Sequence, residues 1–294
     1  MLKLIKDSER IINIMNYKLN NGLEIPNIAF GTWKFPDNET TSQIIANAIE
    51  SGYRYIDTAK SYGNEEAVGR GIKNANIKRE DIIIGGKLWN DDRGYDNIIK
   101  ACHKTIEALN CDYLDIYLMH WPASKAVHEN WKEINAETWQ AMEYLYNSRI
   151  VKAIGVCNFK INQLEALMEN AKIKPMINQI ECHPGFMQNE IIEFCKKQDI
   201  LVEAWSPLGS GKLMKKEQMK EIASKYNKDV AQICIKWCLQ NGVLPLPKTS
   251  DKDRMKSNLN VFDFKISQDD MKYLNNLPYM AASGLDSETI TIFN

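Results

Sequence analysis

Residues 53–65 read YRYIDTAKSYGNE, a short apolar run that passes into polar residues and a glycine. The apolar pair Tyr55 and Ile56 is followed at once by the acid Asp57, and the phenol of Tyr62 comes five residues later. An aromatic and β-branched run that ends in polar residues and glycine is typical of a strand passing into a loop. Whether the acid and the phenol have a chemical role depends on which other strands end beside them.

The same pattern recurs along the chain, with short β-rich runs followed by longer segments of helical spacing. The runs that we expect to be strands lie at 28–33, 53–59, 81–89, 114–121, 151–159, 175–184, 200–209 and 243–248. Helical spacing is found at 39–51, 64–76, 94–109, 137–147, 160–170, 188–198, 215–240 in two pieces, and 251–259. Strands that alternate with helices in this way predict βαβ units and a parallel sheet.

Eight such units favour a closed (β/α)8 TIM barrel over the alternative, an open doubly wound sheet. Unusual residues lie at or just beyond the C-terminal ends of seven of the strands, where barrel enzymes build their active sites: Asp57, Lys87, His120, Asn158, Gln179, Trp205 and Lys248. No GxGxxG motif follows the first strand, which argues against a Rossmann domain. The segment YKLNNGLEI, residues 17–25, predicts a β-hairpin turning at Asn21-Gly22, which would cap the bottom of the barrel.

The residues at this rim suggest acid–base chemistry on a carbonyl group. A lysine in the strand GGKLW needs a partner, and Asp57 at the end of a neighbouring strand could supply it. An ammonium group lowers the pKa of a nearby phenol, so Tyr62 could act as a general acid. His120 could orient a carbonyl oxygen. None of these groups can donate a hydride, so a reduction would need a bound cofactor. Alone, each has a structural explanation, such as an ion pair or an interior histidine.

Seven ordered blocks carry a resemblance to a known family: YRYIDTAKSYGNEEAVGRGI, KLW, YLMHWP, GVCNF, NQIECHP, AWSPLG and LPLPKTSDKDRMKSN. In that order they closely resemble the aldo-keto reductases, and within them the bacterial-type members similar to aldehyde and diketogluconate reductases. The resemblance covers roughly residues 16 to 285. It implies a (β/α)8 barrel that uses NADPH, a catalytic tetrad of Asp57, Tyr62, Lys87 and His120, proton donation by Tyr62, and tuning of its acidity by Lys87.

The resemblance also implies positions that bind the cofactor and the substrate. The matching cofactor positions are Thr32, Asp57, Asn158, Gln179, Trp205, Ser206, Leu208, Lys248, Thr249, Arg254 and Asn258. Two cations, Lys248 and Arg254, would suit a 2′-phosphate, which favours NADPH over NADH. The matching substrate positions are Trp33, Trp89, His120 and Trp121, and three indoles favour an apolar or aromatic aldehyde or ketone.

Two cofactor positions depart from the family pattern, and three further segments have an expected position. Cys157 replaces the usual serine, which removes a hydroxyl hydrogen bond to the nicotinamide carboxamide, and Ser257 replaces a frequent acid near the adenine. Residues 122–136 and 283–294 are expected to form outer walls of the pocket. KLMKKEQMK, residues 212–220, is expected to be a solvated helix face.

Composition limits the partners of the chain. Its 294 residues have a net charge of −1, which gives no reason to expect nucleic acid or a membrane surface as partner. Seven cysteines without CxxC pairs predict reduced thiols, a cytoplasmic location and no metal site. We expect a monomer with residues 1–14 as an N-terminal extension and one domain over 15–294. The alternatives are a regulatory barrel that binds NADPH without turnover, and a lyase that forms a Schiff base at Lys87.

Overall fold

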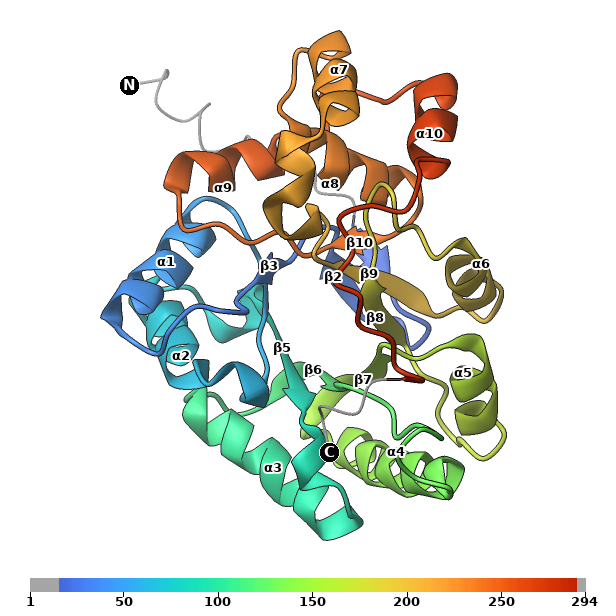
Figure 1. Cartoon of the computed structure of the whole chain (residues 1–294). Helices are drawn as coiled ribbons and strands as arrows, with labels where there is room; N and C mark the ends of the chain where they lie inside the picture. Colours follow the sequence, from blue (N-terminus) through green and yellow to red (C-terminus); the bar gives the residue numbers. More distant parts are fainter. Residues whose placement is uncertain (1–15, 290–294) are drawn as a thin grey trace.

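A computed structural model of the chain describes residues 16–289. The predicted extension at 1–14 therefore lies outside the described residues, and so do the last five residues of the predicted pocket wall. Within the described range, helices surround a central ring of strands, with the strands near the middle of Figure 1 and the helices outside them.

Eight parallel strands form the central sheet, and they neighbour one another in chain order from β3 to β10. Two backbone hydrogen bonds join its edges, because Ala29 N donates to Pro245 O at 3.1 Å and Gly31 N donates to Pro247 O at 3.1 Å. The predicted (β/α)8 barrel is confirmed, and the open-sheet alternative is wrong. The strands are β3 Phe30–Gly31, β4 Tyr55–Asp57, β5 Ile83–Leu88, β6 Leu114–Met119, β7 Val151–Cys157, β8 Ile177–Glu181, β9 Leu201–Trp205 and β10 Leu244–Pro245.

The predicted hairpin lies where it was expected. Strands β1 Asn16–Lys18 and β2 Glu24–Pro26 pair antiparallel. Asn20 Nδ2 donates to Pro175 O at 3.1 Å and to Asp199 O at 3.0 Å, just before β8 and β9 begin. These contacts place the turn at the N-terminal ends of the strands, which is the bottom of the barrel.

The helices follow the predicted segments with two differences. Their bounds are α1 Glu39–Glu50, α2 Glu65–Asn74, α3 Tyr95–Ala108, α4 Trp131–Asn147, α5 Ile161–Met168, α6 Asn189–Lys197, α7 Glu217–Lys225, α8 Val230–Gln240, α9 Lys252–Leu259 and α10 Gln268–Asn275. The predicted start of the fourth helix, residue 137, is wrong, because α4 begins inside the segment expected to be a loop. Helix α10 was not predicted. None of the helices in residues 16–289 is long and apolar enough to cross a membrane.

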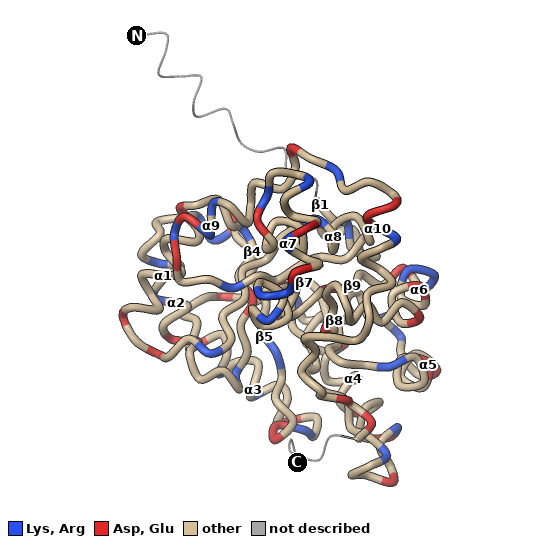
Figure 2. The backbone as a smooth tube through the Cα atoms, turned by 45° about the horizontal axis from the view of Figure 1, so that its top comes forward, with Lys and Arg blue, Asp and Glu red and all other residues tan. Residues whose placement is uncertain are grey.

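Acidic and basic residues are interspersed along most elements, as the near-zero net charge suggests (Figure 2).

The C-terminal segment after α10 crosses the C-terminal ends of the strands (Figure 1). Ser283 Oγ binds Glu181 Oε2 at 2.5 Å at the end of β8, and Lys160 beyond β7 forms an ion pair with Asp286 at 2.7 Å. The described part of this segment therefore lies over the rim of the barrel where the predicted site residues gather.

Candidate active site

A buried ion pair lies at the centre of the rim. Asp57 ends β4 and Lys87 lies near the end of β5, and their side chains are 5% and 1% exposed. Lys87 Nζ donates to both oxygens of Asp57 at 2.7 Å and to the carbonyl oxygen of Thr58 at 3.0 Å. Burial opposes the charge of Lys87, but the Asp57 carboxylate overcomes this effect and raises the pKa of the ammonium group above its usual range. Lys87 is therefore a cation and a poor nucleophile, which disfavours Schiff-base chemistry.

Tyr62 is brought to the same ammonium group by a short 3-10 helix, Lys60–Tyr62, which closes at Gly63 with φ of +64°. Tyr62 Oη accepts a hydrogen bond from Lys87 Nζ at 3.2 Å. The expected depression of the phenol pKa is wrong, because burial raises the pKa of Tyr62 to about 12 even though Lys87 acts in the opposite direction. The phenol is thus held in its protonated form, as a proton donor must be. Lys60 forms an ion pair with Asp92 instead of approaching Asp57.

His120 follows β6 and faces Tyr62 and Trp89. Its ring makes edge contacts with both, at centroid distances of 5.7 Å and 5.2 Å. Burial, with the Lys87 charge as a second cause, holds the pKa of His120 well below its usual value, so the imidazole is neutral. Ser61 Oγ lies 3.3 Å from Nδ1. If Ser61 donates there, the ring proton is on Nε2, which makes that atom a donor. Ser61 was missed from the sequence because a serine in a loop carries no specific signal.

Three predicted cofactor residues form a connected group beside His120. Asn158, with φ of +63°, donates from Nδ2 to His120 O at 3.0 Å and accepts at Oδ1 from Trp205 Nε1 at 2.8 Å. Gln179 Nε2 donates to Asp57 Oδ1 at 3.0 Å and to Glu203 Oε2 at 2.8 Å. The structure therefore links Asn158 and Trp205 to His120, and Gln179 to the buried ion pair. Glu203 was not predicted, although an acid inside the apolar strand ILVEAW was a visible signal.

Predicted residues further along the rim surround the start of α9. Lys248 and Arg254 are exposed, and Lys248 Nζ lies 4.0 Å from the centre of the Phe35 ring. Burial, and next the neighbouring charge of Lys34, lowers the pKa of Lys248. Lys34 was missed from the sequence, where it was one lysine among many. No salt bridge in the described part of the chain neutralises any of these three cations.

The other predicted cofactor positions differ in how far they are exposed to a ligand. Thr249 Oγ1 accepts from Asp251 N at 3.2 Å near the same edge, whereas Asn258, which is part of α9, is almost fully buried. Thr32 is also buried; its backbone N–H donates to Asp57 O at 3.2 Å, and its hydroxyl has no hydrogen-bond partner within residues 16–289. Asn258 and Thr32 contact a ligand only if the surrounding side chains move.

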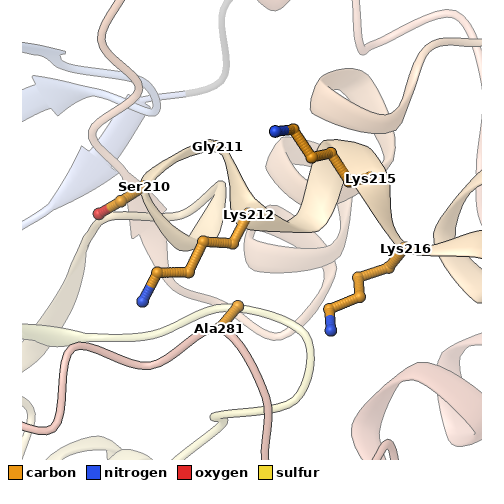
Figure 3. A pocket seen from close by; sticks show the side chains of 6 residues that line it. All are labelled: Ser210, Gly211, Lys212, Lys215, Lys216 and Ala281. Atoms are coloured by element: carbon orange, nitrogen blue, oxygen red, sulfur yellow. The ribbon is translucent and has the colours of Figure 1, made fainter.

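A surface cavity lies beyond β9, in the segment expected to be a solvated helix face. Ser206 Oγ is 3.1 Å from Ser210 Oγ, and Leu208 O accepts from Gly211 N at 3.0 Å. The backbone bends here because Ser210 and Gly211 have φ of +52° and +82°. Lys212 and Lys216 extend on the side of Ala281 in Figure 3. The cavity is lined by Ser210, Gly211, Lys212, Lys215, Lys216 and Ala281. Lys212 and Lys215 are exposed, as expected, but the expected helix is only partly right, because α7 begins at Glu217.

The three tryptophans expected around the substrate have different exposures. Trp33 is 46% exposed and lies under the Lys34 ammonium group, at 4.2 Å from the ring centre. Trp89 is half-buried against His120, and Trp121 is 7% exposed. Only Trp33 and Trp89 therefore offer a substantial ring surface at the rim.

The two departures from the family pattern have structural consequences. Cys157 is buried at the end of β7, and burial raises the pKa of its thiol well above the usual value. Ser257 Oγ donates to Asp229 Oδ2 at 2.7 Å, and Asp229 caps α8. Ser257 therefore has a partner within the protein. All seven cysteines are free, and no group of three or more potential metal ligands occurs among residues 16–289.

Comparison with known proteins agrees with this geometry. The model of the aldo/keto reductase family matches residues 27–278. The chain belongs to this family. Its oxidoreductase relatives include a glyoxal reductase from Bacillus subtilis, 44% identical over 260 residues, with 88% of this chain and 91% of the relative covered. A 9,11-endoperoxide prostaglandin H2 reductase from Trypanosoma cruzi is 41% identical over 262 residues, covering 88% and 90% of the two chains.

Solved structures share the architecture, among them an aldo/keto reductase from Brucella melitensis that is 40% identical with a TM-score of 0.83, covering 89% of this chain and 98% of that one. A mutant of Gox0644, solved in complex with NADPH, is 36% identical with a TM-score of 0.86, and the match covers 94% of this chain and 98% of that one. Membership in the family is therefore supported by sequence along most of the chain and by the barrel itself.

Proposed function

We propose that this aldo/keto reductase reduces small aldehydes and ketones to alcohols with NADPH, and that Tyr62 donates the proton. One observation carries the proposal: Lys87 Nζ contacts the Asp57 carboxylate at 2.7 Å and the Tyr62 hydroxyl at 3.2 Å at the same time. An acid thus lies next to a permanent cation at the rim where barrel enzymes bind their substrates.

The roles follow from the contacts of each side chain. Tyr62 Oη gives its proton to the oxygen of the substrate, and Lys87 stabilises the phenolate that remains. Asp57 keeps Lys87 charged despite its burial. Neutral His120 donates a hydrogen bond that orients the substrate oxygen, with Ser61 on its other ring nitrogen. Trp89 supplies apolar surface against His120, and the exposed ring of Trp33 is the further apolar surface that the family resemblance implies.

The chain's own residues fit a dinucleotide phosphate. When bound, NADPH supplies the hydride that no side chain can provide. Lys34, Lys248 and Arg254 are cations without carboxylate partners in the described residues, which suits the 2′-phosphate. The lysine-lined cavity next to Ser206 and Leu208 suits the pyrophosphate (Figure 3). Asn158, Gln179 and Trp205 would hold the nicotinamide, with Thr249, Thr32 and Asn258 as the remaining contacts that family resemblance implies.

Two further expectations belong with this function. The free state of all seven cysteines supports a reducing compartment such as the cytoplasm. A monomer is expected, and size-exclusion chromatography with light scattering would test it.

The relative named glyoxal reductase makes an α-dicarbonyl compound the first substrate to try.

The test uses the purified full chain with NADPH or NADH and a panel of glyoxal, an aromatic aldehyde and a simple ketone, followed by the loss of NADPH absorbance. Tyr62→Phe should lower kcat by about a hundredfold or more while NADPH still binds. Tyr273→Phe, a change at a half-exposed tyrosine on α10, is the matched control and should leave turnover unchanged. Equal turnover in Tyr62→Phe and the control would refute the assigned acid, and NADPH binding without turnover of any carbonyl would favour a regulatory barrel.

A further inference from the structure

Glu203 is a fully buried acid in the interior of the barrel. Glu203 lies on β9 and is 0% exposed, and burial raises the pKa of its carboxyl group to about 7. Tyr55 Oη, from β4 on another part of the barrel wall, donates to Glu203 Oε1 at 3.0 Å. Because β4 and β9 are not neighbours in the sheet, this contact crosses the barrel interior. Gly85 makes room for it, since a Cβ there would lie 3.0 Å from the Tyr55 ring.

Gln179 lies between this acid and the ion pair of the active site. Its Nε2 donates one hydrogen to Glu203 Oε2 at 2.8 Å and the other to Asp57 Oδ1 at 3.0 Å. An amide nitrogen has two hydrogens, and both are directed at carboxylates. The reversed amide would place its oxygen against two carboxylates, which have no hydrogen to give when ionised. Glu203 and Asp57 together therefore determine which way the Gln179 amide points.

The opposite end of this amide is left available. No hydrogen bond from the protein reaches Gln179 Oε1 within the described part of the chain. The fixed amide thus presents an acceptor, not a donor, on the side away from the two acids. On the adjacent strands, Asn158 just after β7 binds His120 O, and Trp205 at the end of β9 binds Asn158.

We propose that Glu203 is a positioning residue for cofactor recognition: it fixes the Gln179 amide so that Oε1 accepts from the carboxamide NH2 of the nicotinamide. The inference rests on the proposed function, because it assumes that NADPH is the ligand. Glu203 does not touch the cofactor in this account and acts only through Gln179. Its own acceptors hold Tyr55 and Gln179, and Asp57 alone would leave one amide hydrogen without a partner.

The first test needs no variant. In the 3-acetylpyridine analogue of NADPH a methyl group replaces the carboxamide NH2, so the hydrogen bond to Gln179 Oε1 cannot form. Dissociation constants are measured by quenching of tryptophan fluorescence. The wild-type protein should bind NADPH about tenfold more tightly than the analogue. Equal affinity for both would overturn the proposal.

Variants then test whether Glu203 acts through Gln179. Glu203→Leu removes both acceptors, so it should weaken NADPH binding by about tenfold and bring its affinity close to that of the analogue. Glu203→Gln keeps an oxygen that can accept from Gln179, so it should stay within about threefold of wild type. Adding Glu203→Leu to Gln179→Leu should cause no further loss.

The outcomes separate this inference from the proposed function. If Glu203→Leu weakens the binding of NADPH and of the analogue equally, its role is only structural and the proposal fails. If Glu203→Leu does not fold, Glu203→Ala takes its place, because it also removes both acceptors and should bring the affinity for NADPH close to that for the analogue. A wild-type protein that neither binds NADPH nor reduces a carbonyl contradicts the proposed function itself. A wild-type protein that does both but does not distinguish the analogue contradicts only the role of Glu203.

Discussion

Removing one partner of the buried Asp57–Lys87 pair should destabilise the protein more than removing both. In Asp57→Asn, the group that replaces Oδ2 becomes an NH2 at 2.7 Å from the Lys87 ammonium, so two donors face each other. Lys87 keeps three neutral acceptors, which are the amide oxygen at the Oδ1 position, Thr58 O and Tyr62 Oη. In Lys87→Met, the buried Asp57 keeps the Gln179 N–H as its side-chain donor. Each single change leaves one charge without its counter-charge in the barrel interior.

The expected magnitudes follow from the burial of the pair. Breaking a buried ion pair by removing one partner costs about 3–5 kcal/mol, and the remaining neutral contacts place both single variants near the lower value, about 3 kcal/mol. Replacing both charges is often close to neutral. The double variant Asp57→Asn with Lys87→Met should therefore lose less than about 2 kcal/mol, although the two single losses sum to about 6 kcal/mol. All three variants should lack carbonyl reduction.

The assay is chemical denaturation at pH 7 followed by tryptophan fluorescence, after a check that refolding is complete. The exposed pair Lys160–Asp286, with side chains 31% and 41% exposed, provides the control. The same double-mutant cycle there should give a coupling below about 1 kcal/mol. If the losses at Asp57 and Lys87 add in the double variant, the two groups are not coupled. Asp57 would then not be the group that maintains the charge of Lys87.

Three further changes test other parts of the site. Lys248→Ala should raise the KM for NADPH about tenfold and leave the KM for NADH nearly unchanged, because only the former has a 2′-phosphate; equal effects on both in steady-state kinetics would contradict this. Gly85→Ala should lower the free energy of unfolding by about 1–3 kcal/mol, since the new Cβ lies 3.0 Å from Tyr55, and thermal denaturation would show it. Glu203→Gln should become more stable relative to wild type as the pH rises. Burial raises the pKa of Glu203 from 4.5 to about 7, so the wild type loses stability as the pH rises through this range. The difference in unfolding free energy between Glu203→Gln and wild type, measured by denaturation, should therefore change by roughly 2–3 kcal/mol between pH 5 and pH 8.

The positions of the strands and of the reactive residues could be predicted because they depend on local pattern. Apolar runs that end in polar residues identified the strands, and parallel pairing then brought Asp57 and Lys87 to one edge. Helix α4 was predicted to start too late although Asn130, a residue type that favours the N-cap position, precedes it; in the structure the Asn130 side chain makes no capping hydrogen bond. Helix α10 was missed although Ser267 caps it by accepting from Asp270 N, so here a readable signal was overlooked.

The direction of the Tyr62 pKa could not be predicted from residue types, and the reason bears on the chemistry. Sequence places a cation next to the phenol, which predicts a lower pKa, but it does not show how much protein covers the hydroxyl. Burial has the larger effect and raises the pKa to about 12. A phenol with this pKa stays protonated at neutral pH and loses its proton only as the substrate oxygen gains negative charge. The Lys87 charge then stabilises the phenolate formed in that step, so its effect is greatest during the reaction. The buried pair is therefore better explained by proton transfer than by the stability of the barrel.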